Sequence, residues 1–235
     1  MEEKELKTSP KQRVAIILIA ILMLGSIVAS YAAIVLAGNS ASSSGISEER
    51  IAEYEAAYNA ELATFQEITQ SDFEKFVQYK EKIVAYDEAA ANTGEVKVKD
   101  RLTGSGRTLA EGDSNYLAYY VGWCADGTVF DSSFNDATNP TAFTKAIDPS
   151  LGMIDGWTTG VVGMKLGGVR ELTIPSEKAY ASNREICGGY NKPLKFLVMA
   201  VANEEPLSSV AAAVDQAYMK LQYAVVLGID YDAEM

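Results

Sequence analysis

Apolar and polar residues repeat with different periods along the chain, and these periods predict its elements. Residues 14–37 are apolar without a charge, whereas residues 47–92 place apolar side chains every three or four positions, as an amphipathic helix does. Residues 94–203 carry short runs typical of strands, and residues 206–228 return to helical spacing. The expected segments are a polar terminus (1–13), a membrane helix (14–37), a flexible Gly/Ser-rich linker (38–46), a helical stalk (47–92), a folded domain (94–203) and a C-terminal amphipathic helix (206–228).

The first apolar segment is long enough to cross a membrane. Its 24 residues would span roughly 36 Å as a helix, which exceeds the ~30 Å hydrocarbon core. The basic residues before it are Lys4, Lys7, Lys11 and Arg13, and none follows before residue 50. The positive-inside rule therefore predicts a single-pass protein of the cell membrane, with a cytoplasmic N-terminus and an extracytoplasmic C-terminal domain. The alternative is a signal peptide cleaved near Ala32, which would give a secreted protein.

The stalk is expected to be one long helix that needs a partner surface. Ser47 followed by two glutamates is typical of a helix N-cap, and the spacing of residues 71–74 marks a place for a break or kink. Its aromatic-rich stripe must pack either on a second copy, as a homodimer through the stalk, or on the rest of the same chain. The stripe consists of Ile51, Tyr54, Tyr58, Leu62, Phe65, Ile68, Phe73, Phe76, Val77, Ile83 and Val84.

The C-terminal segment has the pattern of a second amphipathic helix. Ser208 is placed to cap a helix over Ser209–Leu227, and Gly228 is placed to end it. We expect this helix to pack on the stalk or on the domain, and we expect Asp230–Met235 to fray.

The central domain reads as a small α+β unit. Strands are expected at Glu95–Asp100, Asn115–Trp123, Val169–Ile174 and Leu194–Val201, with one short helix at Thr158–Met164. Several strands and few helices in about 110 residues predict an antiparallel sheet.

Composition narrows the chemistry that this domain can perform. The 235 residues include no histidine and only two cysteines, which excludes histidine-dependent nucleophiles and structural zinc sites. The net charge of −12 argues against nucleic acid as a partner, because binding phosphate needs a basic face. No metal cluster or acid–base pair stands out, so no cofactor is expected.

Five blocks of the central domain occur in a recognisable order between Val96 and Asn203. They are Gly106–Thr108 with Tyr119–Gly122, Asp126–Ser133, Met153–Val161 with Met164–Gly168, Leu172–Pro175 with Ala179–Tyr180, and Leu194–Phe196. In this order they resemble the FK506-binding-protein (FKBP-type) family of peptidyl-prolyl cis-trans isomerases. The resemblance implies a curved antiparallel sheet around a short helix. It also implies an enzyme whose substrates are proline-containing unfolded or exported polypeptides.

The residue types suit that reaction. Rotation about an X-Pro bond breaks no covalent bond, yet it meets a barrier of ~18–20 kcal/mol because amide resonance is lost. The twisted amide is less polar than the planar one, so a dry aromatic pocket favours the transition state over the ground state. Such a pocket needs no histidine, metal or cofactor.

The resemblance also assigns residues to the site. Ile154 matches the position whose backbone N–H binds a ligand carbonyl, Tyr180 the one whose hydroxyl does so, and Asp131 the pocket carboxylate. With Tyr120, whose hydroxyl would donate to Asp131, these are the expected catalytic residues. The expected substrate-binding residues are Phe130, Phe143, Met153, Trp157 and Phe196.

Two departures from the family pattern favour a second reading. The basic partner often found five positions after the pocket aspartate is replaced by Asp136, which would either repel Asp131 or point to water. Residues 181–193, which shape and close the pocket, are atypical. The alternative function is thus a catalytically weak binding or chaperone module tethered to the membrane. Cys124 and Cys187 are either a disulfide of an exported domain or two buried thiols.

Overall fold

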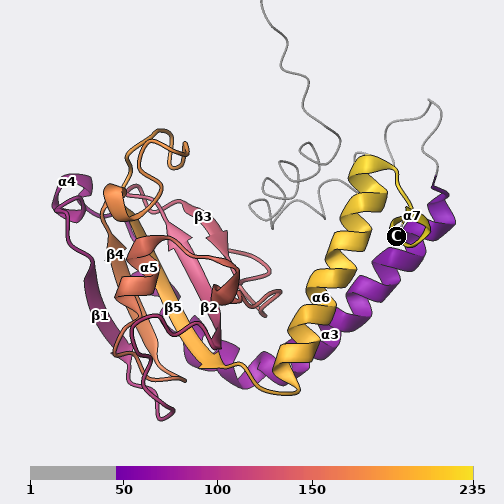
Figure 1. Ribbon diagram of the computed structural model, residues 1–235, viewed down its shortest axis with the longest axis horizontal. Coiled ribbons are helices and arrows are strands. Elements are labelled where there is room, and N and C mark those ends of the chain that lie inside the picture. Colours follow the sequence, from indigo (N-terminus) through magenta and orange to yellow (C-terminus); the bar gives the residue numbers. More distant parts are fainter. Residues whose placement is uncertain (1–45, 235) are drawn as a thin grey trace, which may run out of the picture. The chain divides into compact units, whose positions relative to one another are not determined.

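The structure, a computed structural model, describes residues 46–234 (Figure 1). The predicted terminus 1–13, the membrane segment 14–37 and all of the linker before Ile46 lie outside the described residues. Between Ile46 and Glu234, no helix is both long and apolar enough to cross a membrane.

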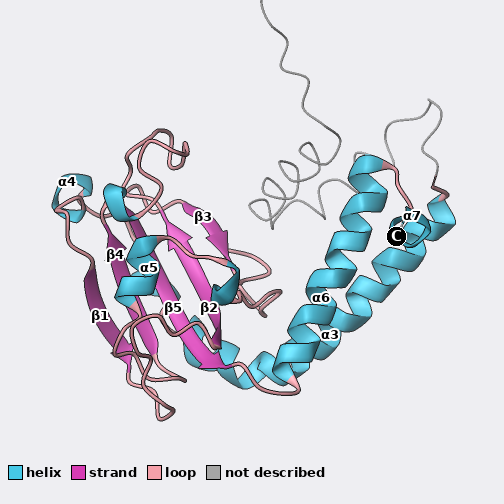
Figure 2. Cartoon of the chain, in the orientation of Figure 1, coloured by secondary structure: helices cyan, strands magenta, loops and turns pink. Residues whose placement is uncertain are grey.

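Five antiparallel strands form one sheet in the order β1–β4–β5–β2–β3, which confirms the expected α+β class (Figure 2). The short edge strand β3 was not among the expected strands. The bounds are Lys97–Leu102 (β1), Tyr116–Trp123 (β2), Val129–Ser132 (β3), Val169–Ile174 (β4) and Leu194–Ala202 (β5).

The short helix of the domain, α5, lies at Asp155–Gly160 and not at the expected Thr158–Met164. It starts directly after Ile154, whose backbone is extended and whose carbonyl accepts the N–H of Trp157. It stops early because Gly163 adopts a left-handed conformation with φ of 78°, which turns the chain away. Trp157 therefore lies within the first turn of the helix.

Side chains alternate between the two faces of the sheet, so that each face builds its own apolar core. The cup-side core lies on the face with α5, and the arm-side core lies on the opposite face. From β2 and β5 the cup-side core takes Tyr116, Ala118, Tyr120, Phe196, Val198 and Ala200, whereas the arm-side core takes Leu117, Tyr119, Val121, Trp123, Leu197, Met199 and Val201.

Two antiparallel helices, which we call the helical arm, are α3 (Glu48–Val77) and α6 (Leu207–Gln222). The C-terminal part of α3 and the N-terminal part of α6 pack on the arm-side core, and the rest of the pair extends away from the sheet (Figure 1). Phe65, Phe73 and Phe76 of α3 are buried in that core together with residues of α6. Most of the aromatic stripe of the stalk is thus covered by the same chain, although Ile68 and Val84 remain exposed. The stripe therefore no longer requires a homodimer.

Helix α3 begins as expected and ends earlier. The Ser47 side chain accepts the N–H of Arg50 and caps the helix. The helix does not break at residues 71–74, where Phe73 and Phe76 are both buried in the arm-side core. The helix ends at Val77, so the expected 47–92 helical stalk is too long.

The remaining stalk residues follow the surface of the sheet domain. They form a single 3₁₀ turn at Lys80–Lys82 and a short helix, α4 (Glu88–Ala91), separated by extended chain. The backbone carbonyl of Val84 accepts the indole N–H of Trp123 at 3.0 Å, and the N–H of Tyr86 donates to the carbonyl of Ala125. Tertiary hydrogen bonds therefore override the helical spacing of Ile83 and Val84.

The C-terminal helix differs from its prediction at both ends. It begins at Leu207 without a side-chain cap, so Ser208 lies inside the first turn. It continues through a π-helical turn at Tyr223–Leu227 and ends at Gly228, which adopts the expected left-handed conformation. Of the residues expected to fray, Tyr231–Glu234 form α7, and Met235 lies outside the described residues.

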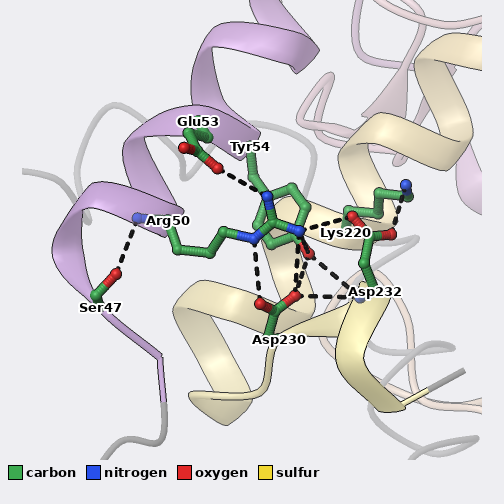
Figure 3. Close-up of polar contacts among 7 residues, drawn as sticks. All are labelled: Ser47, Arg50, Glu53, Tyr54, Lys220, Asp230 and Asp232. Carbon is green, nitrogen blue, oxygen red and sulfur yellow. Dashed lines mark hydrogen bonds and ion pairs between the residues drawn. The ribbon is translucent and has the colours of Figure 1, made fainter.

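A polar cluster fixes α7 to the first turns of α3 (Figure 3). Arg50 donates to Asp230 (Nε–Oδ2, 3.1 Å) and to Asp232 (Nη2–Oδ2, 2.8 Å), and the Tyr54 hydroxyl donates to Asp230 at 2.5 Å. Lys220 on α6 pairs with Asp232 at 2.7 Å. We call this set the terminal latch, because it joins the C-terminal residues to the start of the arm.

Candidate active site

Three aromatic residues from three elements form the centre of the cup-side core. Trp157 of α5 is fully buried, with its ring 5.8 Å from Tyr120 of β2 and 5.6 Å from Phe196 of β5, each in an edge-to-face arrangement. Phe130 of β3 continues the group, with its ring 5.6 Å from Phe196. The four rings define an aromatic cup, and this is the set that the sequence predicted, except for Phe143.

A glycine makes room for this arrangement. Gly122 on β2 lies opposite Asp131 on β3 and Phe196 on β5. A Cβ atom at this position would lie 2.6 Å from Phe130 Cζ and 2.7 Å from Phe196 Cε1, which is closer than real contacts allow. The missing side chain therefore lets the two phenylalanine rings meet across the strand.

The tryptophan is oriented by a tyrosine that sequence reasoning missed. The indole N–H of Trp157 donates to the hydroxyl of Tyr116 at 3.0 Å. Tyr116 lies on β2 four residues before Tyr120, on the same face of the sheet. That spacing was the available signal, since residues i and i+4 of a strand point to one side.

A polar triad lies at the edge of the cup. The Tyr120 hydroxyl donates to Asp131 Oδ2 at 2.5 Å, and the ammonium of Lys145 donates to Asp131 Oδ1 at 2.7 Å. The Lys145 ammonium also lies 5.4 Å from the centre of the Tyr120 ring. Burial and the neighbouring carboxylate raise the pKa of Tyr120 well above its usual value, so its hydroxyl remains a donor at neutral pH.

The cationic partner of Asp131 is Lys145, although the position where the family often has a basic residue is occupied by Asp136. The Asp136 side chain is exposed and accepts the backbone N–H groups of Thr138 (2.7 Å) and Asn139 (3.0 Å), which lower its pKa. Of the two expected alternatives, Asp136 therefore points to water and does not repel Asp131. The carboxylate of Asp131 pairs with Lys145, which lies in a later loop. No sequence signal pointed to Lys145, because the pairing depends on the path of that loop.

The two residues expected to supply carbonyl-binding donors, Ile154 and Tyr180, pack against the cup-side core. Ile154 is partly buried, and its backbone N–H donates to no acceptor within residues 46–234. Tyr180 packs against the cup-side core, and burial raises the pKa of its hydroxyl. Met153 is partly buried against the same core. Ile154, Tyr180 and Met153 therefore all pack against the core that contains the aromatic cup.

Phe143 is the predicted site residue that lies elsewhere. Its ring is fully buried in the arm-side core and stacks on Tyr119 with ring centres 4.1 Å apart. Phe143 pairs with Phe134 in an isolated antiparallel bridge, and both rings lie in the arm-side core. Ile147 pairs with Ala118 and packs against the cup-side core instead.

The atypical loop 181–193 closes one side of the site. Cys187 forms a disulfide with Cys124, which directly follows β2, and the two Cα atoms are 5.5 Å apart. Ile186 of the loop is buried in the cup-side core, and the Arg184 guanidinium lies 4.6 Å from the centre of the Tyr180 ring. Of the two readings of the cysteines, the structure therefore shows the disulfide.

Fold and site together define a peptidyl-prolyl isomerase domain that uses an aromatic cup and no histidine. The family model described as "FKBP-type peptidyl-prolyl cis-trans isomerase" matches residues 106–201. An FK506-binding protein of Neisseria meningitidis serogroup C is 36% identical over 108 residues, which is 46% of this chain and 93% of that protein. The chain belongs to the FKBP-type family and is a peptidyl-prolyl cis-trans isomerase.

Two further comparisons each cover less than half of this chain. FK506-binding protein 4 of Chaetomium thermophilum is 40% identical over 87 residues, which is 37% of this chain and 17% of that protein. The protein in the crystal structure of AtFKBP13 is 28% identical in sequence to this chain. The match covers 47% of this chain and 94% of that protein, with a TM-score of 0.37.

Proposed function

We propose that this isomerase acts on exported polypeptides outside the cytoplasm, where residues 14–37 anchor it to the membrane. The observation that carries the proposed site is the aromatic cup together with two residues that pack against the same core and carry donors, Ile154 with its N–H and Tyr180 with its hydroxyl. A proline ring on Trp157 would place the preceding carbonyl near these donors. Proline-containing segments are therefore the proposed substrates.

In the proposed mechanism the cup acts by differential binding. Phe130, Trp157 and Phe196 exclude water from the amide, which disfavours the polar planar form more than the twisted form. The carbonyl, once rotated, accepts from Ile154 N–H or from Tyr180. Asp131 holds Tyr120 in place, and no proton is transferred at any step.

The disulfide supports the proposed compartment. Disulfides persist in oxidising environments outside the cytoplasm, and Cys124–Cys187 links two parts of the domain. An uncharged run of 24 residues before the arm has four basic residues on its N-terminal side and none between its end and Arg50, which supports a membrane anchor with the domain outside. Protease added to intact cells from which the outer layers have been removed should digest the domain and spare residues 1–13. Protection of the domain until the membrane is lysed would contradict the proposed orientation.

The proposed site is tested with the full chain in detergent or lipid nanodiscs. Tyr180→Phe should lower kcat/KM for a proline-containing tetrapeptide by about fivefold, because a hydrogen bond to the rotated carbonyl is lost. Tyr190→Phe makes the same chemical change in the adjacent loop at a side chain that is 55% exposed, and should leave the rate unchanged. Equal values of kcat/KM for Tyr180→Phe and the parent protein would show that the Tyr180 hydroxyl has no role in catalysis.

A binding module with weak catalysis is the second candidate, and the loop 181–193 favours it. Ile186 occupies the cup-side core, and Trp157 has no exposed surface, so the loop restricts access to the cup. This candidate predicts that the chain suppresses aggregation of an unfolded client without proline while its isomerase rate stays near that of buffer. A high rate without suppression would reject it.

A further inference from the structure

One short segment connects the helical arm to the polar triad. Residues 142–147 run beside the chain that follows β3: Thr144 N–H donates to the carbonyl of Ser133 (2.8 Å), and Asn135 N–H donates to that of Ala142 (3.1 Å). Within this segment Phe143 enters the arm-side core, and Lys145, two residues later, donates to Asp131 beside the cup. The segment thus contributes to both sides of the sheet domain.

Helix α3 holds the Phe143 end of the segment. The ring centres of Phe73 and Phe76 lie 5.3 Å and 5.7 Å from that of Phe143. Phe143 also stacks on Tyr119 of β2, so its ring is enclosed between the arm and the sheet. Side chains in so dense a core adopt few alternative positions, and the backbone of residues 142–147 is fixed accordingly.

The Lys145 end of the segment holds the carboxylate. Lys145 and Asp131 are each about one-fifth to one-quarter exposed, at 24% and 21% of their side-chain surface, so their pairing is partly shielded from water. Each oxygen of Asp131 receives one donor, from Lys145 and from Tyr120. Without Lys145, one oxygen would be free to rotate toward water, and the Tyr120 hydroxyl would follow it.

We propose that Lys145 is a positioning residue of the isomerase site and that helix α3 sets its place by packing on Phe143. The arm is then a component of the active site, although it contributes no side chain to the cup. This inference rests on the proposed assignment of Asp131 and Tyr120 to the site. The experiments below separate a failure of that assignment from a failure of the inference.

A double-mutant cycle in the full chain tests the role of Lys145. Lys145→Met should lower kcat/KM by about tenfold, and Lys145→Arg, which keeps a cationic donor, should recover it to within about twofold. In an Asp131→Asn background, Lys145→Met should change the rate by less than about twofold, because the lysine acts through the carboxylate.

The outcomes of the cycle are distinct. A parental rate for Asp131→Asn rejects the assignment of the site itself. A reduced rate for Asp131→Asn together with a parental rate for Lys145→Met rejects only the proposed role of Lys145. Equal effects of Lys145→Met in both backgrounds, or no recovery with arginine, show a general structural defect and also reject it.

Conservative changes in α3 test the link to the arm. Phe73→Leu and Phe76→Met loosen the packing on Phe143 and should each lower kcat/KM by about threefold, an effect that disappears in the Lys145→Met background. Tyr58→Leu removes a ring of α3 that packs on Tyr218 of α6 and should leave the rate unchanged. Rates are compared well below the unfolding temperature of each variant, checked by circular dichroism. If either Phe73→Leu or Phe76→Met folds and has the same kcat/KM as the parent, the proposed link between helix α3 and the active site is rejected.

Discussion

Tyr119 and Tyr120 are neighbours in β2, yet their rings lie in opposite cores and only the Tyr120 hydroxyl forms a hydrogen bond within residues 46–234. The Tyr119 ring stacks on Phe143 in the arm-side core, and its buried hydroxyl has no hydrogen-bond partner within residues 46–234. The Tyr120 ring lies on Trp157 in the cup, and its hydroxyl donates to Asp131. One strand therefore offers two chemically identical side chains in two different roles.

We predict different results for the same substitution at these two positions. Tyr120→Phe should lower the free energy of unfolding by about 1–2 kcal/mol, because a hydrogen bond to a carboxylate is lost, and should lower kcat/KM by about fivefold. Tyr119→Phe should leave kcat/KM unchanged and raise the free energy of unfolding by up to about 1 kcal/mol, because an unsatisfied hydroxyl is removed. Urea unfolding and the tetrapeptide assay measure both quantities. A loss of activity at Tyr119 comparable to that at Tyr120 would contradict this division of roles.

The disulfide should contribute strongly to stability. Cys124 and Cys187 are 63 residues apart, and closing a loop of that size in the unfolded chain is worth about 4 kcal/mol in the chain-entropy relation. Replacing both cysteines by serine should lower the urea midpoint accordingly. Reductant should shift the midpoint of the parent protein and have no effect on the double variant, which serves as its control. An unchanged parental midpoint under reductant would show that the bridge is absent in solution.

Gly122→Ala should disturb the cup from within the sheet. The new methyl group would overlap Phe130 and Phe196, and relieving such overlap in a packed core costs about 1–3 kcal/mol. We expect a lower free energy of unfolding and a higher KM, since the pair of rings must separate. Gly189→Ala is a suitable control for stability, because its Cβ would come no closer than 3.3 Å to the flexible end of Lys192. Parental KM in the folded Gly122→Ala protein would argue against a binding role for these rings.

The terminal latch should make stability depend on pH in the acid range. Ion pairs and hydrogen bonds with Tyr54, Arg50 and Lys220 lower the pKa of Asp230 and Asp232 below the usual value. Carboxyls with a lowered pKa in the folded protein stabilise it above their unfolded pKa of ~3.9, and this contribution is lost as the pH falls through the folded pKa. Arg50→Gln should therefore lower the unfolding temperature at pH 7, and the difference from the parent should shrink below pH ~4.

Lys75→Gln provides the control for the latch, because Lys75 makes a single exposed ion pair with Asp72 on the same helix. Its unfolding temperature should stay close to that of the parent at both pH values. A difference between Arg50→Gln and the parent that persists unchanged at pH 3 would show that the latch acts through packing and not through charge.

Much of the sheet domain could be predicted from local patterns. Four strands followed from their apolar runs, and the order of the sequence blocks placed Tyr120, Asp131, Ile154, Trp157 and Tyr180 around one site. The placement of Phe143 in the cup was wrong, because its ring packs on Tyr119 in the arm-side core. The residue type alone does not say which of the two cores an aromatic side chain joins.

The arm shows a different limit of sequence reasoning. An apolar stripe indicates that a helix must be covered, but it does not say by what. The stripe of α3 is covered by α6 and the sheet, whose contacts bring together residues more than a hundred positions apart, such as Tyr58 and Tyr218. The pairing of Lys145 with Asp131 could not be predicted either, because it follows from the path of a loop and not from the spacing of residues in the sequence.

The placement of the two tryptophans has a practical consequence. Trp123 lies in the arm-side core and Trp157 in the cup-side core, both fully buried, and the chain contains no other tryptophan. Each face of the sheet thus carries its own intrinsic fluorophore. A Trp123→Phe variant would emit only from the cup, and its emission would follow substrate binding. Trp123 alone, in a Trp157→Phe variant, would follow solvent access beneath the arm.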